Sequence, residues 1–293
     1  AVIADKKINE QDIVNEYTGA INTAVRSLVI KDADYSDVDA VKALIPPAEE
    51  LEKYIYMLPY VKDAVVYDST DDGKVVLCAE IYPDPELLGE CTRMSAKEAA
   101  AGGVHLSFAP MIDLARDARW GRVMESSGED QILASALGAA QVKAYQGEDL
   151  TSSEHIAACV KHFAAYGAGE SGRDYNTVDM SERTLREFYL PAYKACIDAG
   201  VKMLMTAFNS LNGLPATVNP LLMKQILREE WGYDGVVVSD WGAIYELTVH
   251  GVAKDLRDAA RLAFDNGCHI DMCSKAYYQN LASLETSMPE VYA

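Results

Sequence analysis

The chain has little positive charge. Its 293 residues include 26 lysines and arginines against 45 aspartates and glutamates, which gives a formal net charge of −19. So acidic a surface disfavours nucleic acid and anionic membranes as partners, and it is compatible with an uncharged small molecule. Composition does not predict an oligomeric state.

Long apolar runs are also missing. No window approaches the roughly 18 consecutive apolar residues that indicate a membrane-spanning helix. The first residues, AVIADKK, lack the basic and apolar blocks of a signal peptide. We therefore expect a soluble protein with no membrane contact, and we favour a cytoplasmic location.

The sequence lacks the residue spacings that typically hold metals. The six cysteines stand singly in apolar surroundings without a CxxC pair, and the five histidines form no HExxH or other paired spacing. This pattern predicts buried thiols in a reducing compartment and leaves a disulfide open. We expect neither a metal nor a cofactor.

One glycine pattern, GAGESG at residues 167–172, satisfies the GxGxxG spacing of dinucleotide-binding loops and follows a predicted strand. In those loops the glycines open a helix whose N-terminus receives the phosphates. Here the residues RDYNTVD come between the glycines and Ser181, the next helix cap. We therefore interpret the segment as a flexible loop beside an active site.

The pattern of the chain changes near residue 90. Residues 1–90 contain helix and strand candidates but no cluster of catalytic side chains, and they predict a small α+β domain of uncertain role. A double proline at residues 46–47 separates the helices, and an Asp-Gly turn joins the strands. The predicted helices are residues 8–29 and 49–57, and the predicted strands are residues 64–67 and 75–82.

Residues 91–293 alternate strand and helix candidates, which predicts an α/β domain built from right-handed βαβ units around a parallel sheet. The leading architecture is an incomplete or modified (β/α)8 TIM-like barrel, because the strand candidates are too few to close it. We expect the two front strands to replace missing barrel strands. The predicted strands are residues 105–109, 157–163, 201–208, 235–239 and 268–272; the predicted helices are residues 130–145, 182–199, 221–231 and 256–266.

The segment GVVVSDWGA, residues 235–243, carries a carboxylate, Asp240, at the exit of a strand buried on both faces. Barrels place their chemistry at this edge of the sheet, although a lone aspartate there is more often a turn cap. Charged and polar groups at the other strand exits would converge with Asp240 on one mouth. They are Asp113, Arg116, Asp117, Arg119 and Arg122; Lys161, His162, Arg173 and Asp174; Asn209; and Asp271.

The residue types at this mouth suit a sugar. A carboxylate beside lysine, histidine and arginine is held ionised, which fits a nucleophile. The same cations donate hydrogen bonds to hydroxyl groups. Trp120 and Trp241 offer flat faces for stacking, although Trp120 is equally expected in the core.

Three of the cations have plainer alternatives. Lys161 and His162 also fit an ordinary strand end, because charged residues are frequent where a strand leaves the sheet. Arg122 also fits a structural ion pair with Glu125 or Glu129. The sequence leaves these alternatives open.

Four segments carry a specific resemblance: FAPMIDLARDARWGRVMESSGED, CVKHFAAYGAGESGRDYN, LMTAFNSLNGLPATVNPLLMKQILREEWGYDGVVVSDWGA and IDMCSKAYYQNL. In this order they are similar to the N-terminal barrel of glycoside hydrolase family 3, nearest its bacterial β-glucosidases, over residues 95–284. The resemblance implies a retaining glycosidase for terminal non-reducing β-D-glucosyl or related residues, with Asp240 as catalytic nucleophile. The substrate-binding residues that it implies are Arg122, Lys161, His162, Arg173, Met205, Phe208 and Trp241.

The same resemblance leaves the mechanism incomplete. In multidomain members the acid/base glutamate lies on a following sandwich domain, and in hexosaminidase-type members a histidine on the loop after the Lys-His pair takes that role. Here the chain stops soon after the barrel motifs, and the loop AAYGAGESGRDYN has no histidine. The early barrel strands, one of which carries a sugar-binding aspartate, are missing as well. We therefore assign a nucleophile and part of a sugar site, but no acid/base.

Residues 8–85 resemble, more loosely, the small C-terminal domain of adenylate-forming acyl-CoA synthetases, through PPAEELEKYIYMLPYVKDAVVYDSTDDGKVVLCAEIYPD. The order of the two matching parts is reversed and that family's phosphate-binding loop is missing, so we assign no adenylation activity. Three hypotheses remain: a glycosidase barrel that is truncated or fused, a catalytically inactive sugar-binding or scaffold domain, and an adenylation-type accessory domain fused to a barrel remnant.

Overall fold

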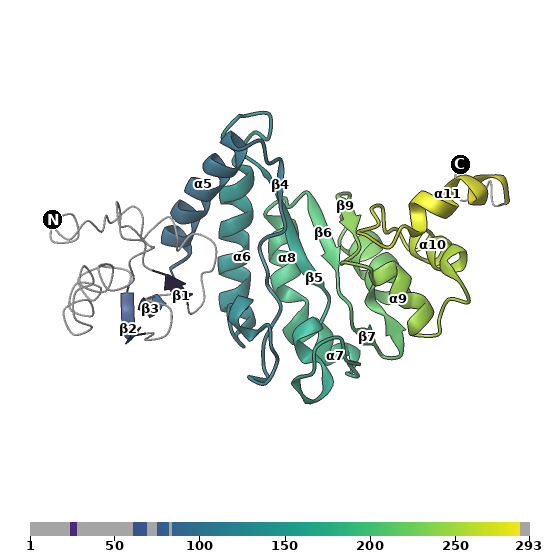
Figure 1. Cartoon of the computed structure of the whole chain (residues 1–293), viewed down its shortest axis with the longest axis horizontal. Helices are drawn as coiled ribbons and strands as arrows, with labels where there is room; N and C mark the ends of the chain where they lie inside the picture. The colour runs from purple at the N-terminus through teal and green to yellow at the C-terminus, as the bar shows by residue number, and fades with distance from the viewer. Residues whose placement is uncertain (1–23, 28–60, 69–74, 82–83, 288–293) are drawn as a thin grey trace, which may run out of the picture. The chain divides into compact units, whose positions relative to one another are not determined.

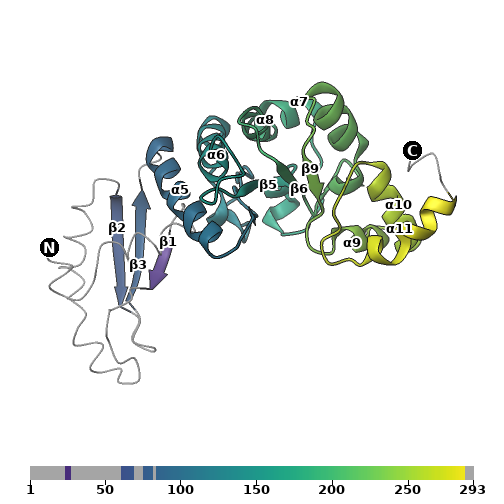
Figure 2. The same cartoon turned by 90° about the horizontal axis from the view of Figure 1, so that it is seen from above.

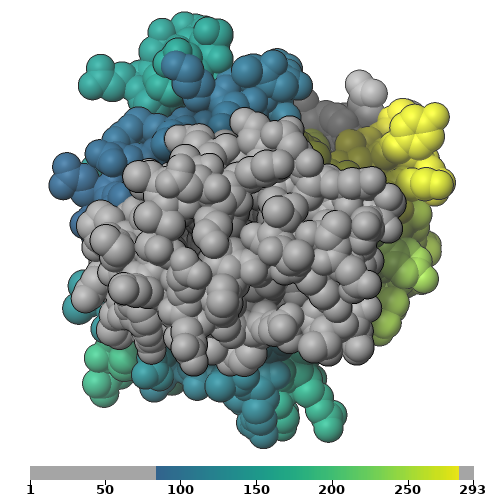
Figure 3. Space-filling model, turned by 60° about the vertical axis from the view of Figure 1, so that its left-hand side comes forward, coloured from purple at the N-terminus to yellow at the C-terminus, as the bar shows by residue number. Residues whose placement is uncertain are grey.

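The structure is a computed structural model that describes residues 24–27, 61–68, 75–81 and 84–287; the other residues are grey in Figure 1 and Figure 3. The backbone divides into two compact units, one up to Ser95 and one from Ala96. The predicted helix at residues 49–57 lies outside the described residues, as does most of the predicted helix at residues 8–29.

Three strands of the first unit form an antiparallel sheet in the order β1-β3-β2: β1 (Ala24–Ser27), β2 (Val61–Asp68) and β3 (Val75–Ile81). The strand predictions for β2 and β3 are confirmed. The helix prediction is wrong for residues 24–27, because pairing of Ala24 with Ala79 and of Ser27 with Val76 outweighs the local helical pattern. This sheet is separate from the parallel sheet, so the prediction that the front strands replace barrel strands is also wrong.

The second unit is built on a parallel sheet in the order β4-β5-β6-β9: β4 (Leu106–Ser107), β5 (Ala157–Phe163), β6 (Met203–Thr206) and β9 (Val236–Val238). All four strands lie within predicted ranges. The fifth predicted strand, residues 268–272, contributes one parallel bridge between Val238 and Ile270. The fold is α/β and TIM-like, and in the described residues its sheet stays open.

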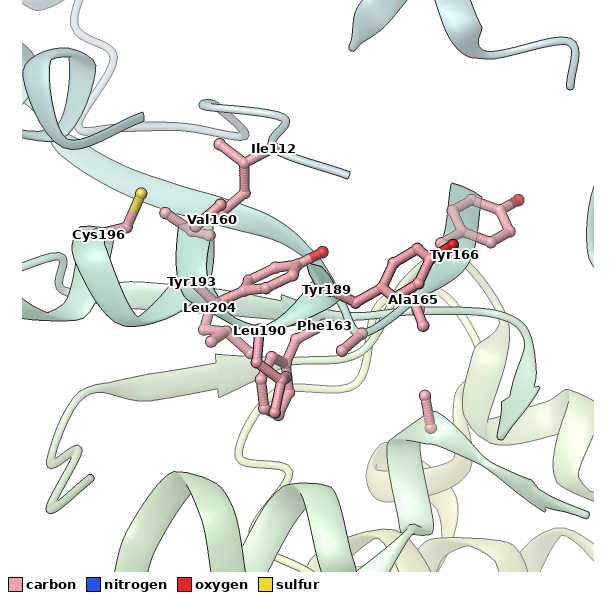
Figure 4. Close-up of a cluster of buried hydrophobic side chains, with 14 of the residues drawn as sticks. Ile112, Val160, Phe163, Ala165, Tyr166, Tyr189, Leu190, Tyr193, Cys196 and Leu204 are labelled. Atoms are coloured by element: carbon pink, nitrogen blue, oxygen red, sulfur yellow. The ribbon is translucent and has the colours of Figure 1, made fainter. Parts of the chain in front are cut away.

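Helices cover one face of this sheet. Figure 2 shows α6 (Gln131–Gln146) and α8 (Pro191–Asp198) on one side of β5 and β6. Because side chains alternate along a strand, Val160 and Leu204 point into the core beneath these helices, where Figure 4 shows them beside Tyr193. The alternate residues form a smaller buried cluster on the opposite face, with Cys159, Met205 and Val238 at its centre.

Helix starts follow the expected chemistry. The Asp130 carboxylate accepts the backbone N–H groups of Ile132 and Leu133 at the start of α6, and Asp255 caps α10 (Leu256–Asp265) by accepting the N–H of Asp258. Such carboxylates also interact favourably with the positive end of the helix dipole. Both helices agree with the predicted ranges.

The predicted continuous helix at residues 182–199 is interrupted at Pro191. It consists of α7 (Glu182–Thr184), a π-helical turn η4 (Leu185–Tyr189) and α8. Proline has no N–H to donate to the preceding turn, and the neighbouring N–H of Leu190 donates to Leu185 O, five residues back. Proline is well suited to the first turn of the new helix.

The remaining elements include three helices that the sequence did not predict, α5, α9 and α11. In the described part of the chain, no helix combines the length and the apolar character needed to cross a bilayer. The bounds are α5 (Pro85–Ala101), η1 (Val123–Glu125), η2 (Tyr166–Ala168), η3 (Glu170–Gly172), β7 (Ser210–Leu211), β8 (Leu214–Pro215), η5 (Ala216–Val218), η6 (Leu221–Glu230), α9 (Ala243–Val249) and α11 (Ala276–Ser287).

The cysteines differ in their surroundings. Cys159, Cys196 and Cys268 are buried free thiols, as predicted, and burial raises the pKa of Cys159 to about 12. Cys273 is exposed and Cys91 is partly exposed, so the prediction of buried thiols is wrong for these two. Cys273 lies in the loop before α11, where apolar neighbours in the sequence do not imply burial in the core.

Candidate functional site

Asp240 lies just beyond the end of β9, where hydrogen bonds fix the backbone. The Ser239 N–H donates to Ile270 O, and the Ser239 hydroxyl oxygen accepts the N–H of Met272 at 2.9 Å. Asp240 is buried; its Oδ1 accepts the N–H of Trp241 at 2.7 Å. Its Oδ2 is buried without a hydrogen-bond partner in the described part of the chain. A buried carboxylate oxygen left in this state is available for a ligand.

His162, near the end of β5, is the basic group next to this oxygen. Its Nε2 lies 3.4 Å from Asp240 Oδ2, which is within ion-pair distance but not aligned as a hydrogen bond. The ring is 1% exposed and packs edge-on against Tyr166, with ring centroids 5.1 Å apart. The structure therefore brings together two of the residues predicted to form the site.

Asp113 holds the other side of the His162 ring. Its Oδ2 lies 2.7 Å from His162 Nδ1 and also accepts the backbone N–H of His162 at 2.9 Å. Tyr193 of α8 donates its hydroxyl proton toward Asp113 Oδ1 at 3.0 Å and toward His162 O at 2.5 Å. Sequence reasoning placed Asp113 at a strand exit but missed this contact, and it missed Tyr193 completely.

The pKa of Asp240 is raised above its ordinary value. Burial is the main cause, and it is partly offset by the electrostatic effect of His162, by the N–H of Trp241, and by Arg122 and Lys161. The interpretation from sequence considered only the cations, whereas burial outweighs them. The same cations lower the pKa of Glu125, for which the hydrogen bonds from Arg122 are the largest cause.

Arg122 occupies the ion pair that the sequence left open as its alternative. Its guanidinium donates to both oxygens of Glu125, at 2.7 Å and 2.9 Å, and lies 5.5 Å from the centre of the Tyr166 ring. The side chain stays close enough to Asp240 to lower the pKa of that carboxyl. Arg122 is therefore held in place before any ligand binds.

Aromatic rings line the loop that follows β5. Tyr166 is buried beside Phe208, with centroids 5.7 Å apart, and the half-exposed ring of Tyr175 lies 4.3 Å from Phe208. Sequence reasoning named Phe208 and missed both tyrosines, although they sit in the segment AAYGAGESGRDYN. Trp120 is fully buried and its indole N–H donates to Asp174, so its stacking role is wrong and its core role is confirmed.

The other predicted residues lie in three different settings. Met205 belongs to the apolar cluster on the sheet face opposite the helices. Trp241 is 67% exposed. Arg173 is exposed, and its side chain makes no hydrogen bond or ion pair within the described residues. The structure thus gathers Lys161, His162 and Arg122 around Asp240 more closely than it does Arg173.

The glycines of residues 167–172 serve packing. A side chain at Gly167 would lie 2.4 Å from Leu114 O, and one at Gly172, where φ is +67°, would lie 2.8 Å from Arg119 Cβ. Two short turns, η2 and η3, follow β5 here instead of a long helix. The segment is a closely packed loop without a long helix, and its flexibility stays a prediction.

A further carboxyl lies within electrostatic range of Asp240. Glu246, on α9, has a raised pKa, mainly through burial and also through the negative charge of Asp240. The sequence gave no reason to single it out. The described residues contain no group of three His, Cys, Asp or Glu side chains that could hold a metal ion.

Comparison with known proteins identifies the family. Residues 74–290 match the sequence model of the glycosyl hydrolase family 3 N terminal domain. The chain belongs to glycosyl hydrolase family 3. It is 50% identical over 192 residues to a periplasmic beta-glucosidase of Salmonella typhimurium and 38% identical over 229 residues to a beta-xylosidase of Formosa agariphila.

A solved beta-glucosidase structure is similar in fold to this chain. The beta-glucosidase of Listeria innocua in complex with glucose is 48% identical, with a TM-score of 0.68 over 71% of this chain and 30% of that one. The Salmonella and Formosa matches cover 66% and 76% of this chain but 25% and 31% of those proteins. The chain thus spans about a quarter to a third of the length of these relatives. The cytoplasmic location and the resemblance of residues 8–85 to acyl-CoA synthetases stay predictions.

Proposed function

We propose that this chain carries the nucleophile and part of the sugar site of a retaining β-glycosidase that acts on terminal non-reducing β-glucosyl or related β-glycosyl residues. The observation that carries the proposal is the Asp240 carboxylate: it is buried and near three basic side chains, and its Oδ2 lacks a hydrogen-bond partner among the described residues. Relatives named as beta-glucosidase and beta-xylosidase support the substrate class.

In the proposed reaction, Asp240 attacks the anomeric carbon and forms a covalent glycosyl-enzyme, which water then hydrolyses. The leaving oxygen requires a proton from a second carboxyl about 5–5.5 Å from the nucleophile. We assign no described residue to that role. An activated leaving group departs without a proton, so it allows the nucleophile to be tested alone.

The proposed sugar contacts follow from position. Lys161 and Arg122 lie near Asp240 and donate hydrogen bonds to sugar hydroxyls, while His162 accepts one through its Nε2. Arg173 reaches the sugar from its exposed loop. Met205 and Phe208 supply apolar walls. Trp241, which is exposed next to the nucleophile, supplies a face for the sugar or its leaving group.

The decisive experiment uses 2,4-dinitrophenyl 2-deoxy-2-fluoro-β-glucoside, whose leaving group departs without an acid and whose fluorine slows hydrolysis of the intermediate. We expect intact-mass spectrometry to show one added fluoroglucosyl group on the chain, and peptide mapping to locate it on Asp240. The adduct should be absent from Asp240→Ala and present in Asp234→Asn, which changes an exposed aspartate just before β9. An adduct elsewhere would refute the assignment of Asp240.

A second candidate function is a sugar-binding or scaffold domain without catalysis, which is favoured by the raised pKa of Asp240, because a carboxyl that is less readily ionised is a weaker nucleophile. Calorimetric titration with glucose separates the two. Glucose binding that survives in Asp240→Ala, together with no covalent adduct and no release of nitrophenol from nitrophenyl β-glucoside, would support the binding domain.

A further inference from the structure

Asp113 is a fully buried carboxylate that the proposed reaction does not use. It lies on the segment that runs from β4 beside β5, and this segment is tied to β5 by the bridge between Met111 and Lys161 and by the hydrogen bond from Ile112 N to Lys161 O. Its side chain is 0% exposed. A buried carboxylate requires several donors to remain in the interior.

Three donors meet Asp113, and two of them come from one residue. Oδ2 receives the backbone N–H of His162 and the ring Nδ1 of the same residue, at 2.9 Å and 2.7 Å, while Oδ1 receives the hydroxyl of Tyr193 at 3.0 Å. The Tyr193 hydroxyl also reaches His162 O. Asp113 and Tyr193 together therefore grip both the backbone and the ring of His162.

This contact decides which ring nitrogen carries the proton. An ionised carboxylate can only accept hydrogen bonds, so the imidazole proton belongs on Nδ1, which lies 2.7 Å from Asp113 Oδ2. Nε2 is then the free atom, and it is the atom that faces Asp240 Oδ2 at 3.4 Å. In serine hydrolases a buried aspartate orients the catalytic histidine in a similar way.

We propose that Asp113 and Tyr193 are positioning residues, which hold the His162 ring with its proton on Nδ1 so that Nε2 is presented to Asp240. The effect on sugar reactivity rests on the proposed function, but the state of the ring does not. Tyr166 packs edge-on against the His162 ring and limits its rotation, while the Asp113 contact sets which ring nitrogen carries the proton.

The ring can be tested without any substrate. Long-range ¹H–¹⁵N spectra of the ¹⁵N-labelled chain distinguish protonated from unprotonated ring nitrogens, and His162→Gln identifies the His162 signals among those of the five histidines. We expect one tautomer with a protonated Nδ1 in the unmodified chain and a mixture of tautomers in Asp113→Ala. Asp113→Asn should restore the single tautomer, because its amide oxygen can accept both N–H groups while its NH₂ donates to the Tyr193 oxygen.

The second readout is the rate of labelling of Asp240 by the activated fluoroglucoside. We expect Asp113→Ala to slow it at least about tenfold, Asp113→Asn to recover part of the rate, and Tyr193→Phe to slow it less than Asp113→Ala does. Tyr277→Phe is the matched control, because it removes a buried hydroxyl that donates to Cys268 O in a different apolar cluster. This control should label at the unmodified rate.

The outcomes separate the two claims. If the unmodified chain is never labelled but the ring spectra follow the expected order, the positioning role stands and the proposed function fails. A single protonated-Nδ1 tautomer and an unchanged labelling rate in folded Asp113→Ala would overturn the positioning role. If Asp113→Ala does not fold, Tyr193→Phe decides: an Nδ1 shift that moves there but not in Tyr277→Phe supports the proposal, and an unmoved shift overturns it.

Discussion

The chain places a basic side chain between two carboxyls in two very different surroundings. On the surface, Arg186 donates to Glu182 at 2.7 Å and to Glu230 at 2.6 Å, and its side chain is 34% exposed. In the interior, His162 lies between Asp113 and Asp240 and is 1% exposed. The shortest distance is similar in the two groups, 2.7 Å from His162 to Asp113 and 2.6 Å from Arg186 to Glu230, but water and salt screen only the surface group.

The difference in solvent exposure determines how much each group affects stability and the reacting carboxylate. Around Arg186, hydration compensates for the loss of either partner, so the arrangement adds little to stability and perturbs no reacting group. Around His162, removal of a partner leaves an unpaired polar group in a medium that cannot hydrate it. The interior group is therefore costly to disturb, and its field acts directly on the pKa of Asp240.

The largest effect on stability should come from Asp113→Ala. It leaves the His162 N–H groups without their acceptor, and loss of one partner of a buried charged network typically costs about 3–5 kcal/mol. Chemical denaturation should show this as a lower midpoint at an unchanged m-value. Asn266→Ala, which removes a different buried polar side chain, should cost clearly less; equal losses would mean that the Asp113 network is not special.

Tyr193→Phe should have the next largest effect. The ring stays in the core shown in Figure 4, and only the hydroxyl that bridges Asp113 and His162 is lost. A hydrogen bond to a charged group contributes about 1.5–3 kcal/mol, whereas the neutral bond lost in Tyr277→Phe contributes about 1 kcal/mol. Thermal unfolding of the two variants side by side checks this order, and a reversed order would contradict the buried-charge argument.

The pH dependence of labelling should report the raised pKa of Asp240. Only the ionised carboxylate attacks, so the rate should rise with pH and level off above a pKa that is higher than that of an ordinary aspartate. Lys161→Met removes a positive charge that lowers this pKa, so it should move the rising limb to higher pH. A limb that stays in place, or moves to lower pH, would show that Lys161 does not act on the nucleophile.

The smallest effect should come from Arg186→Gln. The surface group is partly exposed and screened, so we expect no change in Tm beyond the error of the measurement and no change in the labelling rate. Repetition in high salt provides the control, because salt should weaken the Arg186 contacts in the unmodified chain and leave the His162 network unaffected. A large loss of Tm would remove the contrast between the two groups.

The elements that the sequence predicted best are those with strong local patterns. Residues 157–163 form β5 as predicted, because a short, mostly apolar run such as AACVKHF is typical of a buried strand in an α/β chain. The helix at residues 182–199 was predicted as continuous because its apolar spacing crosses Pro191 unchanged. The helix prediction for residues 24–27 was wrong because their pairing partner, β3, lies far along the chain and leaves no local pattern.

In the candidate site, too, local patterns identified single residues, whereas contacts between distant residues were missed. Asp240 and His162 were identified from strand exits and family motifs, which need no knowledge of contacts. The contact between His162 and Asp113 joins residues 49 positions apart and depends on how the segment after β4 runs beside β5. No local pattern encodes that register. The pairing of Arg122 with Glu125 could be considered from the sequence because the two residues are only three positions apart.

The three tryptophans sit in unequal environments, and this gives the chain its own optical reporter. Trp120 is fully buried and Trp231 packs against the core, whereas Trp241 faces water beside the nucleophile. Long-wavelength fluorescence and acrylamide quenching should therefore arise mostly from Trp241. A sugar seated on that indole would shift its emission toward the blue and shield it from the quencher, so occupancy of the proposed site can be followed without a dye.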